Sequence, residues 1–133
     1  MTSKQAREIE FEKIYVKARM AGLAAGEASK PTPMIVEEHT NMMDDNSPVK
    51  EQYFVEGGVC GFAWVSIYPG NSPFANWLKK TERAHKDSYA GGVSIWVSEY
   101  GQSMERKEAF ASAFANSLRQ SGIEKAYSRS RMD

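Results

Sequence analysis

The ten residues from Val59 to Tyr68 constrain the fold more than any other stretch of the chain. In a β-strand, successive side chains point to opposite faces. One face of this stretch would carry Val59, Gly61, Ala63, Val65 and Ile67. The other face would carry Cys60, Phe62, Trp64, Ser66 and Tyr68. Because both sets are largely apolar, the pattern predicts a central strand of a sheet that is covered at least partly on each face.

Two long helices are predicted on either side of this strand in the sequence. Residues 3–29 place apolar side chains three and four positions apart, which predicts an amphipathic helix that ends before Pro31. Thr2 and Gln5 have the spacing of a capping box at its start. The second half of this helix is lined with small residues that allow another element to approach closely: Ala18, Ala21, Gly22, Ala25 and Gly26. A second long helix is predicted to follow residues 101–103 and to end at Gly122.

The remaining elements complete the predicted architecture. Strands are predicted at residues 34–36, 52–55, 93–100 and 124–127, with a hairpin turn at Gly57 and Gly58 and a short helix starting at Ser72 and Pro73. This order predicts an α+β fold, a two-layer sandwich in which a long N-terminal helix and a long C-terminal helix pack on a mixed sheet of four or five strands. Strands 59–68, 93–100 and 124–127 are linked through helices, so they would run parallel wherever they are neighbours.

The length of 133 residues predicts a single α+β domain over residues 1–133. Within it, residues 39–50 are expected to form a mobile acidic loop and residues 128–133 a polar tail. The chain shows no signal peptide and no apolar run of about 20 residues, so we expect a cytoplasmic protein without a membrane partner. Cys60 is the only cysteine, which excludes an internal disulfide and fits a reducing compartment. Its apolar neighbours predict a buried thiol.

The charges balance, with 17 Lys and Arg against 17 Asp and Glu. Proteins that bind duplex nucleic acid usually carry a net basic charge or a basic face, so this balance argues against nucleic acid as the main partner. The charges are unevenly spread, because residues 31–56 are acidic and residues 117–133 are basic. These two segments could meet within one molecule or between the copies of a homo-oligomer.

No sequence motif of a known catalytic or metal site is present. The two histidines are His39 and His85, and neither has a second ligand at helical spacing. His39 with Asp44 and Asp45 could hold a metal ion, but a flexible acidic loop is the favoured interpretation of these three residues. We therefore expect no metal, no cofactor and no catalytic residue.

One segment has the character of a ligand site. Residues 100–103 follow a strand and open a long helix, where backbone N–H groups and the helix dipole favour an anion. Nearby aromatic rings could stack on a base, and C-terminal arginines could clamp a phosphate. The predicted ligand-binding residues are Trp96, Tyr100, Gly101, Gln102, Ser103, Arg106, Arg129 and Arg131. In the alternative interpretation Ser103 only caps the helix, Trp96 packs under the first helix and the arginine tail is disordered.

Four stretches of the sequence also carry a resemblance: PTPM at 31–34 after an alanine-rich helix, EGGVCGFAWV at 56–65, IWVSEYGQSMERK at 95–107 and SRMD at 130–133. Their combination resembles a family of small proteins of unassigned role that tailed bacteriophages encode. The resemblance covers about residues 10–133 and implies a phage origin and expression in the cytoplasm of the host bacterium. It implies no activity and names no catalytic residue.

The resulting expectation is a non-catalytic phage accessory protein that acts by binding in the infected cell. It would sequester a small anionic, nucleotide-like signal or block a host defence protein. One alternative is a small enzyme acting on a nucleotide or nucleic acid, with chemistry carried by Glu99, Gln102, Ser103 or Cys60. Another is a structural or self-assembling protein that associates through a strand edge or the small-residue face of the first helix.

Overall fold

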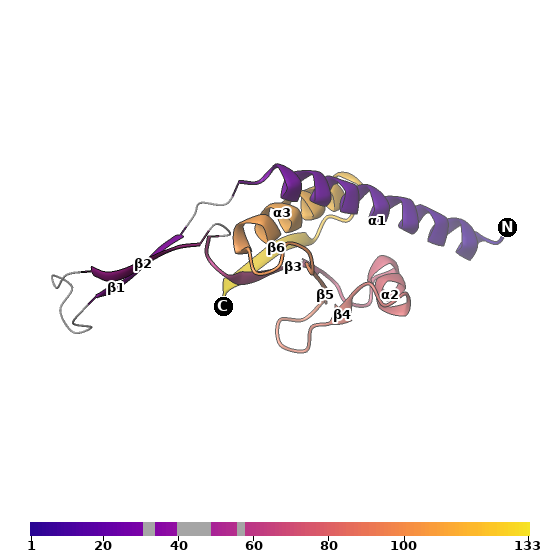
Figure 1. Ribbon diagram of the computed structural model, residues 1–133. Coiled ribbons are helices and arrows are strands. Elements are labelled where there is room, and N and C mark those ends of the chain that lie inside the picture. Colours follow the sequence, from indigo (N-terminus) through magenta and orange to yellow (C-terminus); the bar gives the residue numbers. More distant parts are fainter. Residues whose placement is uncertain (31–33, 40–48, 56–57) are drawn as a thin grey trace.

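The structure, a computed structural model, describes residues 1–30, 34–39, 49–55 and 58–133; for 34–39 and 49–55 it describes the backbone alone. Figure 1 shows the chain order of the three helices and six strands. The helices are α1 (Ser3–Ala28), α2 (Pro73–Lys80) and α3 (Met104–Gln120). The strands are β1 (Met34–His39), β2 (Val49–Val55), β3 (Gly61–Ile67), β4 (His85–Lys86), β5 (Val93–Trp96) and β6 (Ala126–Met132).

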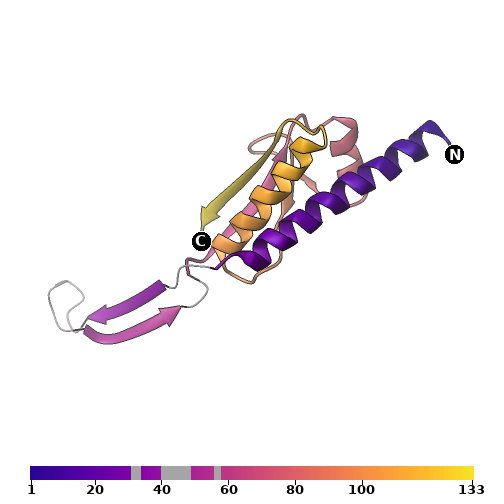
Figure 2. The same cartoon turned by 90° about the horizontal axis from the view of Figure 1, so that it is seen from above.

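The predicted α+β sandwich is confirmed. Strands β4, β5, β3 and β6 form a four-stranded sheet in that order, and α1 and α3 lie together over one of its faces (Figures 1 and 2). The succession from β3 to β6 is β-α-β-β-α-β, which is the succession of ferredoxin-like domains. Here α1 precedes this unit and joins α3 in the helical layer.

Small residues bring the two long helices close together. A Cβ atom at Gly22 would stand 3.1 Å from the Phe110 ring, so a side chain at this position would crowd α3. At Gly26 the added atom would overlap the Tyr100 side chain. The small-residue stripe predicted for the N-terminal helix therefore serves its contact with the C-terminal part of the chain.

The core lies between the sheet and these helices. Ala63, Val65 and Ile67 of β3 are almost fully buried there, as the alternation predicts. α2 closes one end of the core, where the Trp77 ring packs against the rings of Phe11 and Tyr15 from α1. Among the described residues, no helix lies over the face of the sheet opposite α1 and α3, so only one face is covered by helices.

The predicted helix boundaries are confirmed by their caps. Thr2 and Gln5 form a capping box, with the Gln5 backbone N–H donating to the Thr2 hydroxyl at 3.1 Å. Ser72 caps α2 by accepting from the Ala75 backbone N–H at 3.2 Å, and Pro73 occupies the first helical position. α3 is followed by Gly122, which has a positive φ of 98°.

The predicted strand directions are wrong. β3 pairs antiparallel with β5 on one side and antiparallel with β6 on the other, so the sheet is not mixed. The reason is the two-residue strand β4, which lies in a segment that the sequence presents as a charged connection. It reverses the chain between α2 and β5, so that β5 returns antiparallel to β3.

The predicted hairpin through Gly57 and Gly58 is also absent from the described pairing. β2 pairs with β1, with Met34 opposite Val55, and these two strands form a separate two-stranded sheet. In both views this hairpin projects away from the helices and the main sheet (Figures 1 and 2). Of the predicted acidic loop, residues 40–48 lie outside the described residues, while His39, Val49 and Lys50 belong to strands.

Two further expectations are corrected near the C-terminus and at Cys60. Residues 128–132 belong to β6 rather than to a polar tail, because they pair along β3 from Val65 to Gly61. Cys60 is exposed rather than buried. It precedes β3 and forms an isolated bridge with Ser103.

Candidate functional site

The uncovered face of the main sheet gathers aromatic and basic side chains, and we call it the aromatic-basic face. Residues directly opposite each other in an antiparallel pair share a face, which places side chains from all four strands here. The face is made of Phe62, Trp64 and Ser66 from β3, Ser94 and Trp96 from β5, His85 from β4, and Tyr127, Arg129 and Arg131 from β6. Aliphatic side chains are confined to the opposite, helix-covered face.

Two tryptophans form the centre of this face. Trp64 and Trp96 lie opposite each other on the two central strands, and their rings stack with centroids 4.7 Å apart and planes inclined by 29°. The Phe62 ring meets the Trp96 ring edge-on at 6.3 Å. Trp96 is 47% exposed, so a large part of this aromatic surface is open to solvent.

Three cations border the aromatic rings. The Arg131 guanidinium lies 5.5 Å from the centroid of the Phe62 ring, and the Arg129 guanidinium lies 5.9 Å from that of Tyr127. From the other side, the buried stem of Lys107 brings its ammonium to 5.5 Å from the Phe62 ring. Such cation–π contacts hold the cations beside the rings without neutralising their charge.

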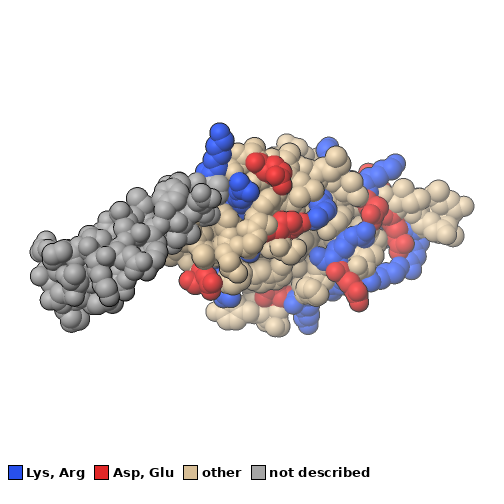
Figure 3. All heavy atoms as spheres, viewed as in Figure 1, with Lys and Arg blue, Asp and Glu red and all other residues tan. Residues whose placement is uncertain are grey.

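These cations are not paired with carboxylates in the described part of the chain. The ion pairs there join Arg19 to Glu99, Lys80 to Glu8 and Arg83 to Glu12, all on the helical side or at the α2 end. On the side of the molecule seen in Figure 3, acidic and basic side chains alternate. The aromatic-basic face differs because its arginines keep their charge available to a ligand.

A carboxylate does stand at the β4 corner of the face. Asp87 accepts hydrogen bonds from the backbone N–H groups of Ala90 and Tyr89, at 2.8 and 3.0 Å, and from the Ser94 hydroxyl at 3.2 Å. The bond from Ala90, with those from Tyr89 and Ser94, lowers the pKa of Asp87. Its role is to fix the turn between β4 and β5, at the edge of the sheet opposite β6.

At the start of α3, where the anion site was predicted, backbone N–H groups donate to backbone carbonyl groups of the protein itself. The Met104 N–H donates to the Val59 carbonyl at 3.1 Å, and the Ser103 N–H donates to the Tyr100 carbonyl at 3.1 Å. Ser103 itself is buried. The Gln102 carbonyl accepts from the Gly61 N–H at 3.1 Å, so this segment is hydrogen-bonded to the beginning of β3.

Tyr100 is directed into the helical layer. Its hydroxyl donates to the Leu23 carbonyl of α1 at 3.4 Å, in the space left by Gly26. Burial raises the pKa of Tyr100, the nearby Glu27 and Glu99 raise it further, and Arg106 opposes this. Tyr100 and Arg106 therefore belong to the α1–α3 side of the molecule.

The structure thus divides the eight predicted ligand-binding residues. Trp96, Arg129 and Arg131 lie on the aromatic-basic face, and Tyr100 with Arg106 lies on the opposite, helical side. Gly101 and Gln102 are exposed in the connecting loop, and Ser103 is buried beneath it. The chain end does run beside the start of α3, since the Asp133 N–H donates to the Cys60 carbonyl. The sheet nevertheless separates the arginine side chains from Tyr100 and Arg106.

The described residues show little that resembles a catalytic centre. Glu99 is engaged by Arg19 at 2.7 Å. The Ser94 hydroxyl donates to Asp87, and His85 makes no hydrogen bond to either in the described part of the chain, so no proton relay joins the three. The described residues also contain no cluster of three or more potential metal ligands. Asp44 and Asp45 lie outside the described residues, and only the backbone of His39 is described.

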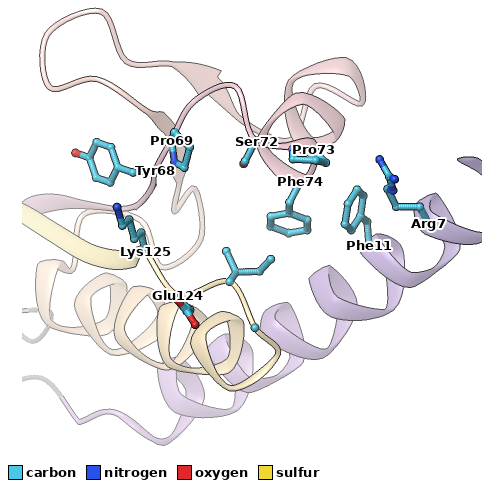
Figure 4. A pocket seen from close by; sticks show the side chains of 11 residues that line it. Arg7, Phe11, Tyr68, Pro69, Ser72, Pro73, Phe74, Glu124 and Lys125 are labelled. Carbon is cyan, nitrogen blue, oxygen red and sulfur yellow. The ribbon is translucent and has the colours of Figure 1, made fainter.

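A groove of about 450 Å³ lies at the end of the sheet next to α2 (Figure 4). Its apolar wall is formed by Phe11, Phe74, Pro69, Pro73 and Ile123. Figure 4 shows the Phe11 and Phe74 rings side by side between Arg7 at one end and Tyr68 with Lys125 at the other. Sequence patterns gave no indication of this groove, because its walls come from three parts of the chain that are far apart in sequence: α1, residues 68–74 and residues 122–125.

Sequence reasoning missed the other aromatic residues of the face, Phe62, Trp64 and Tyr127, and also Lys107 of α3, whose ammonium lies beside the Phe62 ring. The alternation did place Phe62 and Trp64 away from the core, but their side was expected to be covered. A usable signal was present. This side of the two central strands carries Ser66 and Ser94 beside the aromatic residues, and in β6 serines alternate with tyrosine and arginine. Polar residues on one side of a strand are typical of a sheet with one solvated face.

Comparisons with models of known protein families, with curated proteins and with solved structures gave no match. The resemblance to a phage family, and the phage origin and expression in the host cytoplasm that it implies, therefore remain predictions. Within the described residues, no helix has the length and apolarity needed to cross a membrane.

Proposed function

We propose that this protein binds single-stranded nucleic acid across the aromatic-basic face. The observation that carries the proposal is the stacked pair of the half-buried Trp64 and the exposed Trp96 on the two central strands, bordered by the β6 arginines at positions 129 and 131. The proposal keeps the expectation that the protein acts by binding. It places the ligand on the aromatic-basic face instead of the mononucleotide site that was expected at the start of α3. The net charge of zero, which argued against nucleic acid, is less informative than this local arrangement.

The chemistry of the face matches both parts of a nucleotide. Every base has a π-face that stacks on an exposed aromatic ring, and such stacking contributes about 1–3 kcal/mol per base. Arginine guanidinium groups bind phosphate oxygens through paired hydrogen bonds. In a common RNA-binding module, aromatic side chains on the open face of a four-stranded sheet stack two or three bases. That parallel is an analogy of surface chemistry, since no relationship is found.

The face favours a single strand over a duplex. In a duplex the base faces are stacked on one another, so the tryptophans could not reach them. Arg129 and Arg131 are two residues apart on one strand, which separates their Cα atoms by roughly 6.6 Å. This spacing lets a strand that runs along β6 place two of its phosphates against the two guanidinium groups.

The proposal can be tested by fluorescence anisotropy with labelled oligonucleotides. Oligo(U) and oligo(dT) of about 12 nucleotides, within the usual site sizes of about 4–16, are compared with a blunt duplex of equal length. We expect both single strands to bind and the duplex to bind more weakly. Replacing Trp96 by Ala should weaken single-strand binding by roughly 5- to 150-fold, the equivalent of one stacked base.

The matched control is Tyr89→Ala, because Tyr89 is a fully exposed aromatic residue in the turn between β4 and β5. Circular dichroism should show both variants folded. Absence of binding to either single strand at low salt would contradict the proposal. So would equal affinities of the Trp96→Ala and Tyr89→Ala variants.

A further inference from the structure

We infer that the bound strand continues beyond the aromatic-basic face and places a base in the groove at the end of the sheet. This inference rests on the proposed function and adds a second subsite to it. Three observations connect the groove with the aromatic-basic face.

The first observation is continuity. Tyr68 lines the groove, and its ring lies 6.3 Å from the ring of Tyr127, which is on the aromatic-basic face. Tyr127 is 42% exposed, so the surface between the two rings is open. Along β3 the distance from Phe62 to Tyr68 is about 20 Å, from six residues at about 3.3 Å each. A drawn-out strand of a few nucleotides covers this distance.

The second observation is the shape and lining of the groove. Pockets for small ligands usually enclose about 300–1,000 Å³ and are mostly apolar, and this groove encloses about 450 Å³. The Phe11 and Phe74 rings meet at 5.3 Å with their planes inclined by 73°. The Phe74 ring is buried and stacks on Trp77. The half-buried Phe11 ring and the exposed proline at position 69 give a base apolar surfaces to lie against (Figure 4).

The third observation is charge. Lys125 stands beside Tyr68 at the mouth of the groove, and Arg7 stands at its far end (Figure 4). Both are exposed, and in the described part of the chain neither forms an ion pair. Glu124 lies on the same rim and opposes a phosphate. Lys125 is therefore placed to meet the phosphate that joins a base in the groove to the strand on the face.

The decisive experiment measures affinity against oligonucleotide length, from about two to about ten nucleotides, for the whole protein and charge-reversal variants. The wild type should gain affinity until the oligonucleotide is long enough to reach the groove. Lys125→Glu should weaken binding of the long oligonucleotides several-fold and leave the shortest ones unchanged. Glu124→Lys should have the opposite effect on the long ones.

Lys17→Glu is the matched control, because Lys17 is exposed on the outer side of α1 and changes the net charge equally. If Lys125→Glu resembles Lys17→Glu at every length while Trp96→Ala still weakens binding, the groove subsite is refuted and the proposed function stands. If no oligonucleotide of any length binds, the proposed function fails and the groove subsite with it.

Discussion

The three tryptophans differ in exposure, and exposure rather than residue type decides which of them can contact a ligand. Trp77 is buried under α1 against Phe11 and Tyr15, whereas Trp96 is 47% exposed. All three lie in apolar stretches of sequence, and from those stretches all three resemble core residues. The difference is that Trp64 and Trp96 lie on strands with only one covered face.

At the same scale, Arg129 and Arg131 should determine the salt dependence of binding. Each phosphate contact on a single strand contributes about 0.7 to the slope of log affinity against log salt concentration. Replacing both arginines by Ala should therefore lower the slope by about 1.4. Lys13→Ala with Lys17→Ala removes the same charge from the outer side of α1. An equal loss of slope in both double variants would show that the arginines do not contact the phosphates.

At the scale of elements, the α1–α3 contact depends on missing side chains. Gly22 lies against Phe110, and Gly26 lies against Tyr100 from the segment before α3. In an exposed helix, glycine is less favourable than alanine by about 1 kcal/mol. The two glycines therefore occupy positions where helix propensity alone would favour a larger residue.

Gly26→Ala should accordingly destabilise the protein. Crowding of Tyr100 costs about 1–3 kcal/mol, and the gain in helix propensity offsets about 1 kcal/mol of it, so we expect a net loss of about 1 kcal/mol. Urea unfolding measures this change in the free energy of unfolding. In a Tyr100→Ala background the ring is gone, and the same substitution should become stabilising. A stabilising effect in the otherwise wild-type protein would contradict the close packing.

Tyr100 also makes this contact sensitive to alkaline pH. Burial, with Glu27 and Glu99 nearby, raises the pKa of Tyr100 in the folded state above its value in the unfolded chain. The neutral phenol therefore stabilises the fold fully below the unfolded pKa of about 10. That contribution is lost as the pH rises through the folded pKa.

The Tyr100→Phe variant tests this dependence. It loses the hydrogen bond to Leu23, worth about 0.5–1.5 kcal/mol, at neutral pH. The difference in unfolding free energy between wild type and variant should shrink as the pH rises above about 10. Urea unfolding at a series of pH values checks this, and a difference that is constant across the alkaline range would refute the buried phenol.

At the scale of the whole molecule, local patterns predicted the elements better than their arrangement. The alternation from Val59 to Ile67 and the cap at Thr2 are local properties, and the structure confirms both. Strand directions depend on β4, whose two residues are too few to carry a pattern. The separate β1–β2 sheet likewise depends on which strand β2 pairs with, and a sequence stretch does not determine that choice.

The candidate site was predictable only in part, because the chemistry of single residues is a local property and their arrangement in space is not. Trp96, Arg129 and Arg131 were singled out for their chemistry, and the structure places them together. Tyr100 was grouped with them because it is close in sequence, but β5 ends at Trp96, and the Tyr100 hydroxyl donates to the Leu23 carbonyl on the helical side of the sheet. Trp64 was set aside because the covering layer on its side was assumed to exist.

The tryptophan indoles allow the most direct test of the central claim, that the aromatic-basic face binds single-stranded nucleic acid. Three indole N–H signals are expected in the NMR spectrum of the labelled protein, one for each tryptophan. On addition of an unstructured oligo(U) or oligo(dT), the signals of Trp64 and Trp96 should shift, while that of the buried Trp77 stays in place. A spectrum in which none of the three signals moves, or only that of Trp77, would contradict the claim.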